Sequence, residues 1–131
     1  MSTPRIPDDR PYVLTADGLT RINREVGGKG EARPTLLAVA ITYGSGRGLT
    51  QERTDPIERA AATLHCVCLL RPYVDRNALT AYIAARVILG AHGLTVHASV
   101  HEAEDMLAAV STHRLELPGI RRWLRRHTRS L

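Results

Sequence analysis

Two apolar patterns of helical spacing, Pro56–Leu70 and Asn77–His92, are joined by a short turn, and this pair constrains the fold most. The turn carries an acid, an amide and two arginines, and it opens directly onto the second helix. The chain has no Phe and few other aromatic residues, so Leu, Ile, Val and Ala must fill the core. That composition favours helices packed through small side chains over an aromatic-rich β-sandwich.

Capping signals mark where further helices begin. Thr15 is a candidate N-cap, with Gly27-Gly28 as the stop, and Pro34 suits the first position of a short helix. Thr54 or Asp55 with Pro56 starts the helix before the turn, and Ser99-Val-His-Glu102 matches the S-x-x-E capping box. Leu117-Pro118-Gly119 opens the last helix, and Thr95–Ala98 is expected to be one brief extended segment.

Apolar spacing identifies a stripe on each helix. Ile57, Ala61, Leu64 and Cys68 mark one buried stripe before the turn. The other helices are marked by Leu14, Leu19, Ile22 and Val26, by Leu79, Ile83 and Val87, by Met106, Leu107 and Val110, and by Ile120, Trp123, Leu124 and His127. Gly93 is the better candidate to end the helix after the turn. We therefore expect an all-α, single-domain bundle of about five or six helices.

The 131 residues are about one domain long, and no internal repeat divides them. Residues 1–11 hold three prolines and are expected to form an extended N-terminal arm, followed by one domain over 12–131. Gly44–Thr54 is glycine-rich but lacks the Gly-Lys-Ser/Thr ending of a P-loop, so it is expected to be a surface loop.

The net charge of +5 makes an acidic partner plausible, whether nucleotide, nucleic acid or acidic protein. Cys66 and Cys68 are two residues apart, which points them to different sides of a helix and favours reduced thiols. No apolar run approaches the ~20 residues of a membrane span, and 1–10 contains no signal-peptide core. We expect a cytoplasmic protein that does not enter a membrane.

The turn itself, Arg71-Pro-Tyr-Val-Asp-Arg-Asn-Ala-Leu-Thr-Ala81, resembles the Fic/Doc motif His-Pro-Phe-x-Asp-Gly-Asn-Lys-Arg-Thr-Ala. The resemblance runs from about Tyr12 to His127, and the first helix, Leu14–Val26, is similar to that of Doc-type (death-on-curing) proteins. Members of this family transfer AMP to hydroxyl groups of target proteins. Doc itself is a kinase that acts on elongation factor Tu, as the toxin of a toxin–antitoxin pair.

The resemblance implies roles for individual positions. Asp75 occupies the place of the acid that binds Mg²⁺ held by phosphates, while Asn77 and the helix N-terminus would cradle those phosphates. Thr80 matches the motif as well and, with Arg76, would lie near a bound nucleotide. Arg71 stands where the family has its general-base His, and a guanidinium with a pKa above ~12 cannot accept a proton at neutral pH. Ala78 and Leu79 replace the motif's Lys and Arg, which removes two phosphate-facing charges.

Each of these residues also has a purely structural interpretation. Asp75 and Asn77 are residue types that cap helices, so they could satisfy the N–H groups of the helix that starts near Asn77. Arg71 and Arg76 could bind an anion, or they could form a salt bridge with Asp75 or another carboxylate that fills the pocket. No histidine offers a replacement base: His65 is the nearest in sequence, and its position on the preceding helix points it to a different face.

The arginines of Arg121–Arg129 raise the question of nucleic-acid binding, for which Trp123 could stack on a base. Helical spacing instead places Trp123 on the core-facing side with Ile120 and Leu124. The arginines then form a solvated face or a docking face for an acidic, antitoxin-like partner.

Three functional hypotheses result. The first is a degenerate Fic/Doc-like protein, a pseudoenzyme that binds a protein or an anionic ligand and needs no cofactor. The second is an active transferase with altered chemistry, in which Asp75 and Asn77 hold Mg²⁺ with ATP or another nucleotide. The third is a basic bundle that binds nucleic acid.

Overall fold

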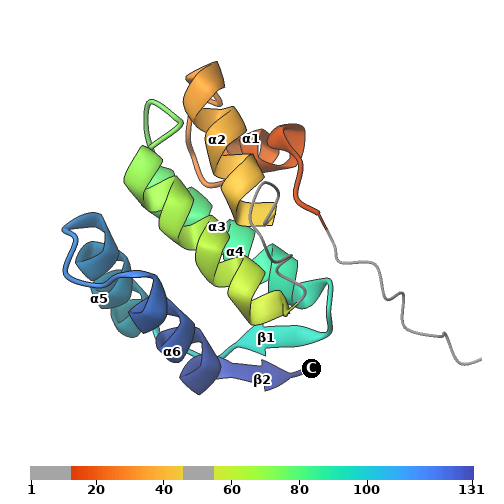
Figure 1. Cartoon of the computed structure of the whole chain (residues 1–131), viewed down its shortest axis with the longest axis vertical. Coiled ribbons are helices and arrows are strands. Elements are labelled where there is room, and N and C mark those ends of the chain that lie inside the picture. The colour runs from red at the N-terminus through yellow and green to blue at the C-terminus, as the bar shows by residue number, and fades with distance from the viewer. Residues whose placement is uncertain (1–12, 46–54) are drawn as a thin grey trace, which may run out of the picture.

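Two antiparallel helices, α3 (Pro56–Leu70) and α4 (Asn77–Gly90), form the centre of the molecule (Figure 1). The computed structural model describes residues 13–45 and 55–131. The expected arm over 1–11 and most of the expected loop over 44–54 lie outside these ranges. Within them, one hydrophobic core joins the helices.

The other helices flank this central pair. Helices α1 (Ala16–Glu25) and α2 (Pro34–Ser45) lie on one side, and α5 (Val100–Ser111) and α6 (Leu117–His127) lie on the other (Figure 1). Two short strands, β1 (Leu94–Val96) and β2 (Thr128–Ser130), complete the described structure. The expectation of an all-α domain of five or six helices is confirmed. No helix in the described part is long and apolar enough to cross a membrane.

Small side chains hold the central helices together. Ala60 and Ala61 of α3 and Ala84 and Ala85 of α4 are fully buried. Because the separation of two packed helices depends on the side chains between them, alanines at this contact bring the backbones close together. Larger residues, including Leu64, seal the rest of the core.

The predicted caps are largely confirmed. The side chains of Thr15 and Asp55 accept hydrogen bonds from Gly18 N–H and Ile57 N–H, at 3.0 and 2.9 Å. Ser99 and Glu102 form the reciprocal capping box of α5. The expected start of α2 at Pro34 is also confirmed, but α2 extends through Ser45 and so takes up the first two residues of the expected loop.

The stripe predicted to mark α4 lies on the wrong side of the helix. Leu79 and Val87 are exposed, and Ile83 is only partly buried. The core side of α4 is built instead from Ala81, Ala84, Ala85, Ile88 and Leu89. The core side of α4 therefore combines small alanines with the larger Ile88 and Leu89, while Leu79 and Val87 stay exposed.

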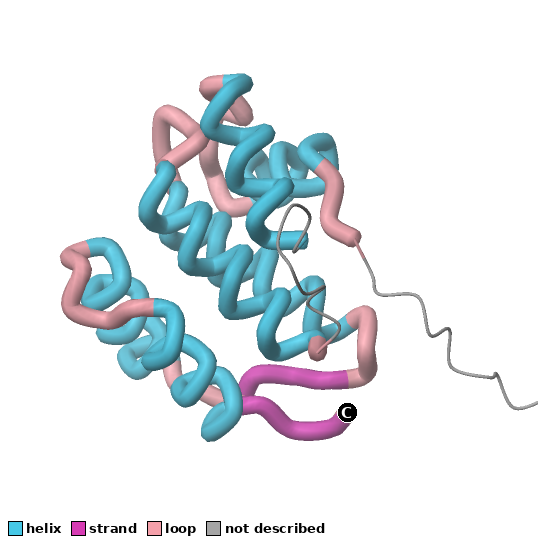
Figure 2. Tube along the Cα trace, in the orientation of Figure 1, coloured by secondary structure: helices cyan, strands magenta, loops and turns pink. Residues whose placement is uncertain are grey.

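The C-terminal strand was not predicted. The expected extended segment at Thr95–Ala98 appears as β1, shifted to Leu94–Val96, and it pairs antiparallel with β2. The strands lie at the opposite end of the molecule from the α3–α4 loop (Figure 2). The helix before β1 ends at Gly90 rather than His92, and Gly93 follows in a turn with φ of 75°.

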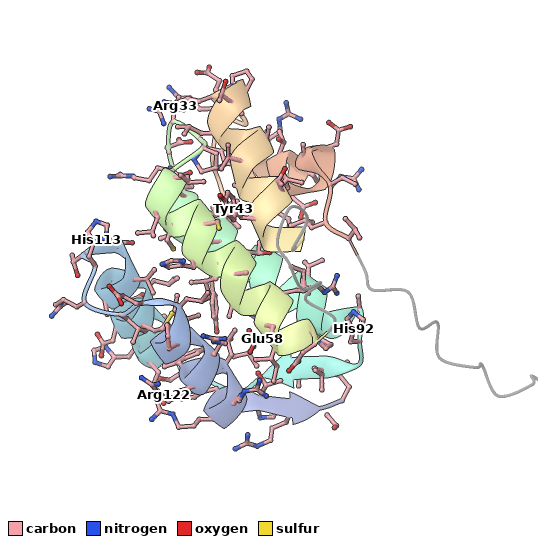
Figure 3. All side chains as sticks on the ribbon, viewed as in Figure 1. Arg33, Tyr43, Glu58, His92, His113 and Arg122 are labelled. Atoms are coloured by element: carbon pink, nitrogen blue, oxygen red, sulfur yellow. The ribbon has the colours of Figure 1, made fainter. Side chains whose placement is uncertain are left out.

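His92 lies in the turn after α4 (Figure 3), and its contact with Arg59 predicts that the fold is sensitive to acid. The Nη2 group of buried Arg59 lies 2.9 Å from His92 Nε2, and since a guanidinium can only donate, this nitrogen must be unprotonated. Desolvation, and then the charge of Arg59, lower the pKa of His92. A lowered histidine pKa gives stability that is present above the unfolded-state value near 6.5 and is lost as pH falls below it.

We expect the His92→Gln variant to lose less stability than the natural protein between pH 7 and pH 5. Urea unfolding at the two pH values measures this difference. His101 is an exposed histidine paired with Asp105, so His101→Gln serves as the control and should keep the natural acid dependence. An unchanged acid dependence in His92→Gln would show that the protonation of His92 does not limit stability.

Candidate anion-binding site

The α3–α4 loop is held by the loop that precedes α2. The backbone N–H of Arg33 donates to Pro72 O at 2.7 Å, and the N–H of Val74 donates to Glu31 O at 3.1 Å. The side chain of Arg33 adds a hydrogen bond from Nη1 to Arg71 O at 2.7 Å. Two loops distant in sequence therefore form one short antiparallel bridge, which fixes the backbone at the start of α4.

Asn23 of α1 links both loops to α4, and sequence reasoning did not single it out. Its side chain is fully buried, and its Nδ2 donates to Asp75 O at 3.0 Å and to Thr80 Oγ1 at 3.1 Å. Its Oδ1 accepts the N–H of Gly30 at 2.8 Å. One amide thus satisfies groups from three segments. The sequence gives one indication that Asn23 is buried: it is a polar residue next to Ile22, close to the apolar stripe of an amphipathic helix.

Asn77 and Thr80 are occupied within the protein. The Asn77 amide accepts from Tyr73 N–H and donates to Tyr73 O, both at 2.9 Å. The Thr80 hydroxyl donates to Arg76 O at 2.6 Å and is completely buried. Both side chains shape the loop, and neither presents a free polar group to a ligand.

The expected helix cap by Asp75 and Asn77 is wrong. The N-cap of α4 is Arg76, whose side chain makes no capping hydrogen bond. Asp75 instead accepts the N–H of Lys29 through Oδ1 at 3.2 Å. Within the described part of the chain, no group accepts a hydrogen bond from the N–H of Ala78 or Leu79. The first turn of α4 is therefore open, with the positive end of the helix dipole exposed.

Arg71 and Arg76 both have left-handed backbone conformations, with φ of 50° and 58°. This region is unfavourable for residues with a Cβ by about 1 kcal/mol or more, so surrounding contacts must hold it. Both side chains are exposed, and the Arg76 guanidinium extends over Gly27 at the end of α1. The salt bridge that was the alternative to anion binding is not seen: among the described residues, no carboxylate lies within ion-pair distance of either arginine.

A hollow of about 390 Å³ lies at this open helix end. Its lining consists of Cys68, Arg71, Asp75, Arg76, Asn77, Ala78, Leu79 and Ser111. Four of the five predicted site residues therefore line one hollow. The fifth, Thr80, is buried beneath it and donates a hydrogen bond to Arg76 O. Two guanidinium groups beside an open helix N-terminus favour an anionic ligand.

Neither the thiol in the hollow nor the histidine nearest to the turn in sequence supplies the general base that the motif has at the position of Arg71. Burial raises the pKa of the Cys68 thiol to about 12, so this thiol is neutral at physiological pH. His65 lies near Glu116 and His113 and is not among the residues that line the hollow. Arg71 cannot take up a proton.

A Mg²⁺ ion would find one carboxylate here. Within the described residues, no group of three or more His, Cys, Asp or Glu side chains is placed to hold a metal. Asp75 is the carboxylate among the lining residues, and its Oδ1 already accepts a hydrogen bond from the backbone N–H of Lys29. Mg²⁺ commonly binds through one or two carboxylates together with substrate phosphates, so Asp75 fits the metal only when a phosphate ligand is present.

The arginines of α6 are partly neutralised. Arg121 Nη1 lies 3.1 Å from Glu58 Oε2, and Arg125 Nη2 lies 3.1 Å from Asp55 Oδ2. Glu58 sits between α3 and α6, while Arg122 lies on the outer face of α6 (Figure 3). Trp123 is buried, as expected, and stacks on His127. These contacts bind α6 to α3 and reduce the basic field available to nucleic acid.

No family model matches the sequence, and no curated protein matches it at a significant level.

Proposed function

We propose that this chain is a Fic/Doc-like pseudoenzyme that binds an anionic ligand, such as a nucleotide phosphate, at the N-terminus of α4. The observation that carries the proposal is the hollow in which Arg71 and Arg76 stand beside the open first turn of α4. Among the described residues, no carboxylate engages either guanidinium, and both side chains are exposed beside the hollow.

The backbone of the loop supports the resemblance to the Fic/Doc motif. Arg76 occupies the position at which the motif has Gly, and its φ of 58° is one that glycine adopts readily. Asn77 holds the turn through its two hydrogen bonds with the backbone of Tyr73. The loop geometry is thus compatible with the motif, although the residues at its chemical positions differ.

Binding without the family's usual transfer reaction follows from Arg71. A proton-accepting group at that position would activate a hydroxyl nucleophile, and a guanidinium cannot do so. Asp75 would hold Mg²⁺ together with the ligand's phosphates. The metal would supply charge neutralisation there, while the two arginines and the helix N–H groups would orient the phosphates.

Calorimetric titration with ATP, with and without Mg²⁺, tests the proposal. We expect the natural protein to bind ATP with micromolar affinity and to transfer neither phosphate nor AMP to a protein substrate. Asp75→Asn should remove the effect of Mg²⁺ while retaining metal-free binding. Failure of ATP and pyrophosphate to bind would rule out the anion site, and transfer activity in the natural protein would favour the active-enzyme hypothesis.

A further inference from the structure

The outward side of α4 carries a row of apolar side chains that the described part of the chain leaves partly exposed. Leu79 and Val87 are 38% and 37% exposed, and Ile83 between them is partly buried. Residues four apart on a helix lie on one face, so the row extends for about 12 Å along the axis. Ile83 also packs against the core, but core packing does not account for the exposed side chains of Leu79 and Val87.

Two hollows lie along this row. The anion-binding hollow reaches the row at Leu79, and a second hollow, of about 260 Å³, is lined by Ile83, Val87, Leu94 and Leu131 among others. The row therefore connects a depression at the start of α4 with one between α4 and the strand pair. Contiguous apolar surface of this kind is typical of a protein-binding site, and a helical partner would fit its spacing.

The charges along the row are mostly positive. Helix α4 contains no Asp or Glu, and its one charged residue, Arg86, lies beside the row with its guanidinium 5.8 Å from the centre of the Tyr82 ring. Arg71 and Arg76 flank the end of the row at Leu79. Asp75 is the carboxylate among the residues that line the anion-binding hollow there. A second copy of this face would bring like charges together, whereas an acidic partner would complement them.

We propose that the outer face of α4 binds an amphipathic helix of another protein. The apolar residues of that helix recur at every fourth position and pack on Leu79, Ile83 and Val87, while carboxylates at one end meet Arg71 and Arg76. Only the contact with these two arginines rests on the proposed anion site. The apolar row and the second hollow, beside Ile83 and Val87, do not depend on the proposed anion site.

Defined fluorescent peptides test this inference. The probe is a helical peptide with leucine at three positions four residues apart and a pair of glutamates at one end, made with the pair at either terminus. Anisotropy titration should show binding of at least one orientation to the natural protein, and at least tenfold weaker binding when lysines replace the glutamates. Val87→Lys should also weaken binding at least tenfold, while Val100→Lys, at an exposed position on α5, should not.

Further measurements test the folding of the variants and distinguish a helical partner from a second copy of this chain. Circular dichroism confirms that both lysine variants keep the natural helix content, and ATP titration of Val87→Lys should match that of the natural protein. If the natural protein binds no probe, or binds it as well with Val87→Lys, the inference is wrong. A dimer in sedimentation equilibrium that Val87→Lys dissociates would assign the row to a second copy and also overturn it. Peptide binding without ATP binding would reject the proposed function alone.

Discussion

Replacing Asn23 with alanine is expected to destabilise the protein by about 3 kcal/mol or more, the largest loss expected from a single polar substitution. The amide is fully buried and makes three hydrogen bonds. Removing it leaves the carbonyl of Asp75, the hydroxyl of Thr80 and the N–H of Gly30 without this partner. Each buried group that loses its hydrogen bond costs about 1–3 kcal/mol. Urea unfolding monitored by circular dichroism measures the change.

An aspartate at the same position separates hydrogen bonding from packing. Asn23→Asp keeps the volume and the acceptor for Gly30 N–H, but it replaces the Nδ2 donor with an oxygen that faces Asp75 O and Thr80 Oγ1. It also buries a charge that no described cation neutralises, so it should cost at least as much as Asn23→Ala. If the aspartate variant were nearly as stable as the natural protein, shape alone would explain the role of Asn23.

A peripheral substitution provides the control. Thr20, also on α1, shares a hydrogen bond of 2.8 Å with the Tyr73 hydroxyl but remains partly exposed. Thr20→Val removes one hydrogen bond rather than three, so it should cost about 1–3 kcal/mol and less than Asn23→Ala. If Thr20→Val and Asn23→Ala lost similar amounts of stability, the three hydrogen bonds of Asn23 would contribute no more than the single contact of Thr20 with the loop.

The role of Asn23 shows which features the sequence could predict. Helix starts at Thr15, Asp55 and Ser99 depend on residues two or three positions away, so local spacing was sufficient to locate them. The partners of Asn23 in the α3–α4 region lie 52 and 57 positions away, and no local pattern reports such a contact. Strand β2 was missed for a related reason: it is three residues long, mostly polar, and defined by its pairing with β1.

Two errors in the sequence interpretation arise from competition between contacts. Periodicity located α4 through its larger apolar residues, but the close approach of α3 selected the alanines for the core. Asp75 and Asn77 are good capping residues in isolation, yet Lys29 and Tyr73 occupy their side chains instead. The sequence therefore predicted which residues gather at the site, while the state of the α4 N-terminus depended on loops elsewhere in the chain.

The open N-terminus leads to the second large effect. Substituting both Arg71 and Arg76 with alanine should weaken ATP or pyrophosphate binding by about 100-fold, or roughly tenfold for each arginine. A hydrogen bond to a charged group contributes about 1.5–3 kcal/mol, and the exposure of both side chains places them near the lower limit. Calorimetric titration at two salt concentrations measures the loss, and the remaining affinity should depend less on salt. Arg122→Ala, on the outer face of α6, should bind like the natural protein.

Arg76→Gly separates the charge of this side chain from its backbone strain. Glycine adopts a φ of 58° without a steric penalty, so this variant should unfold at a higher urea concentration than Arg76→Ala. Both variants should nevertheless lose the same tenfold in anion affinity, because both lack the guanidinium. If Arg76→Gly bound ATP as well as the natural protein, Arg71 and the helix N-terminus would account for binding without Arg76. The left-handed arginine would then have no role in holding the ligand.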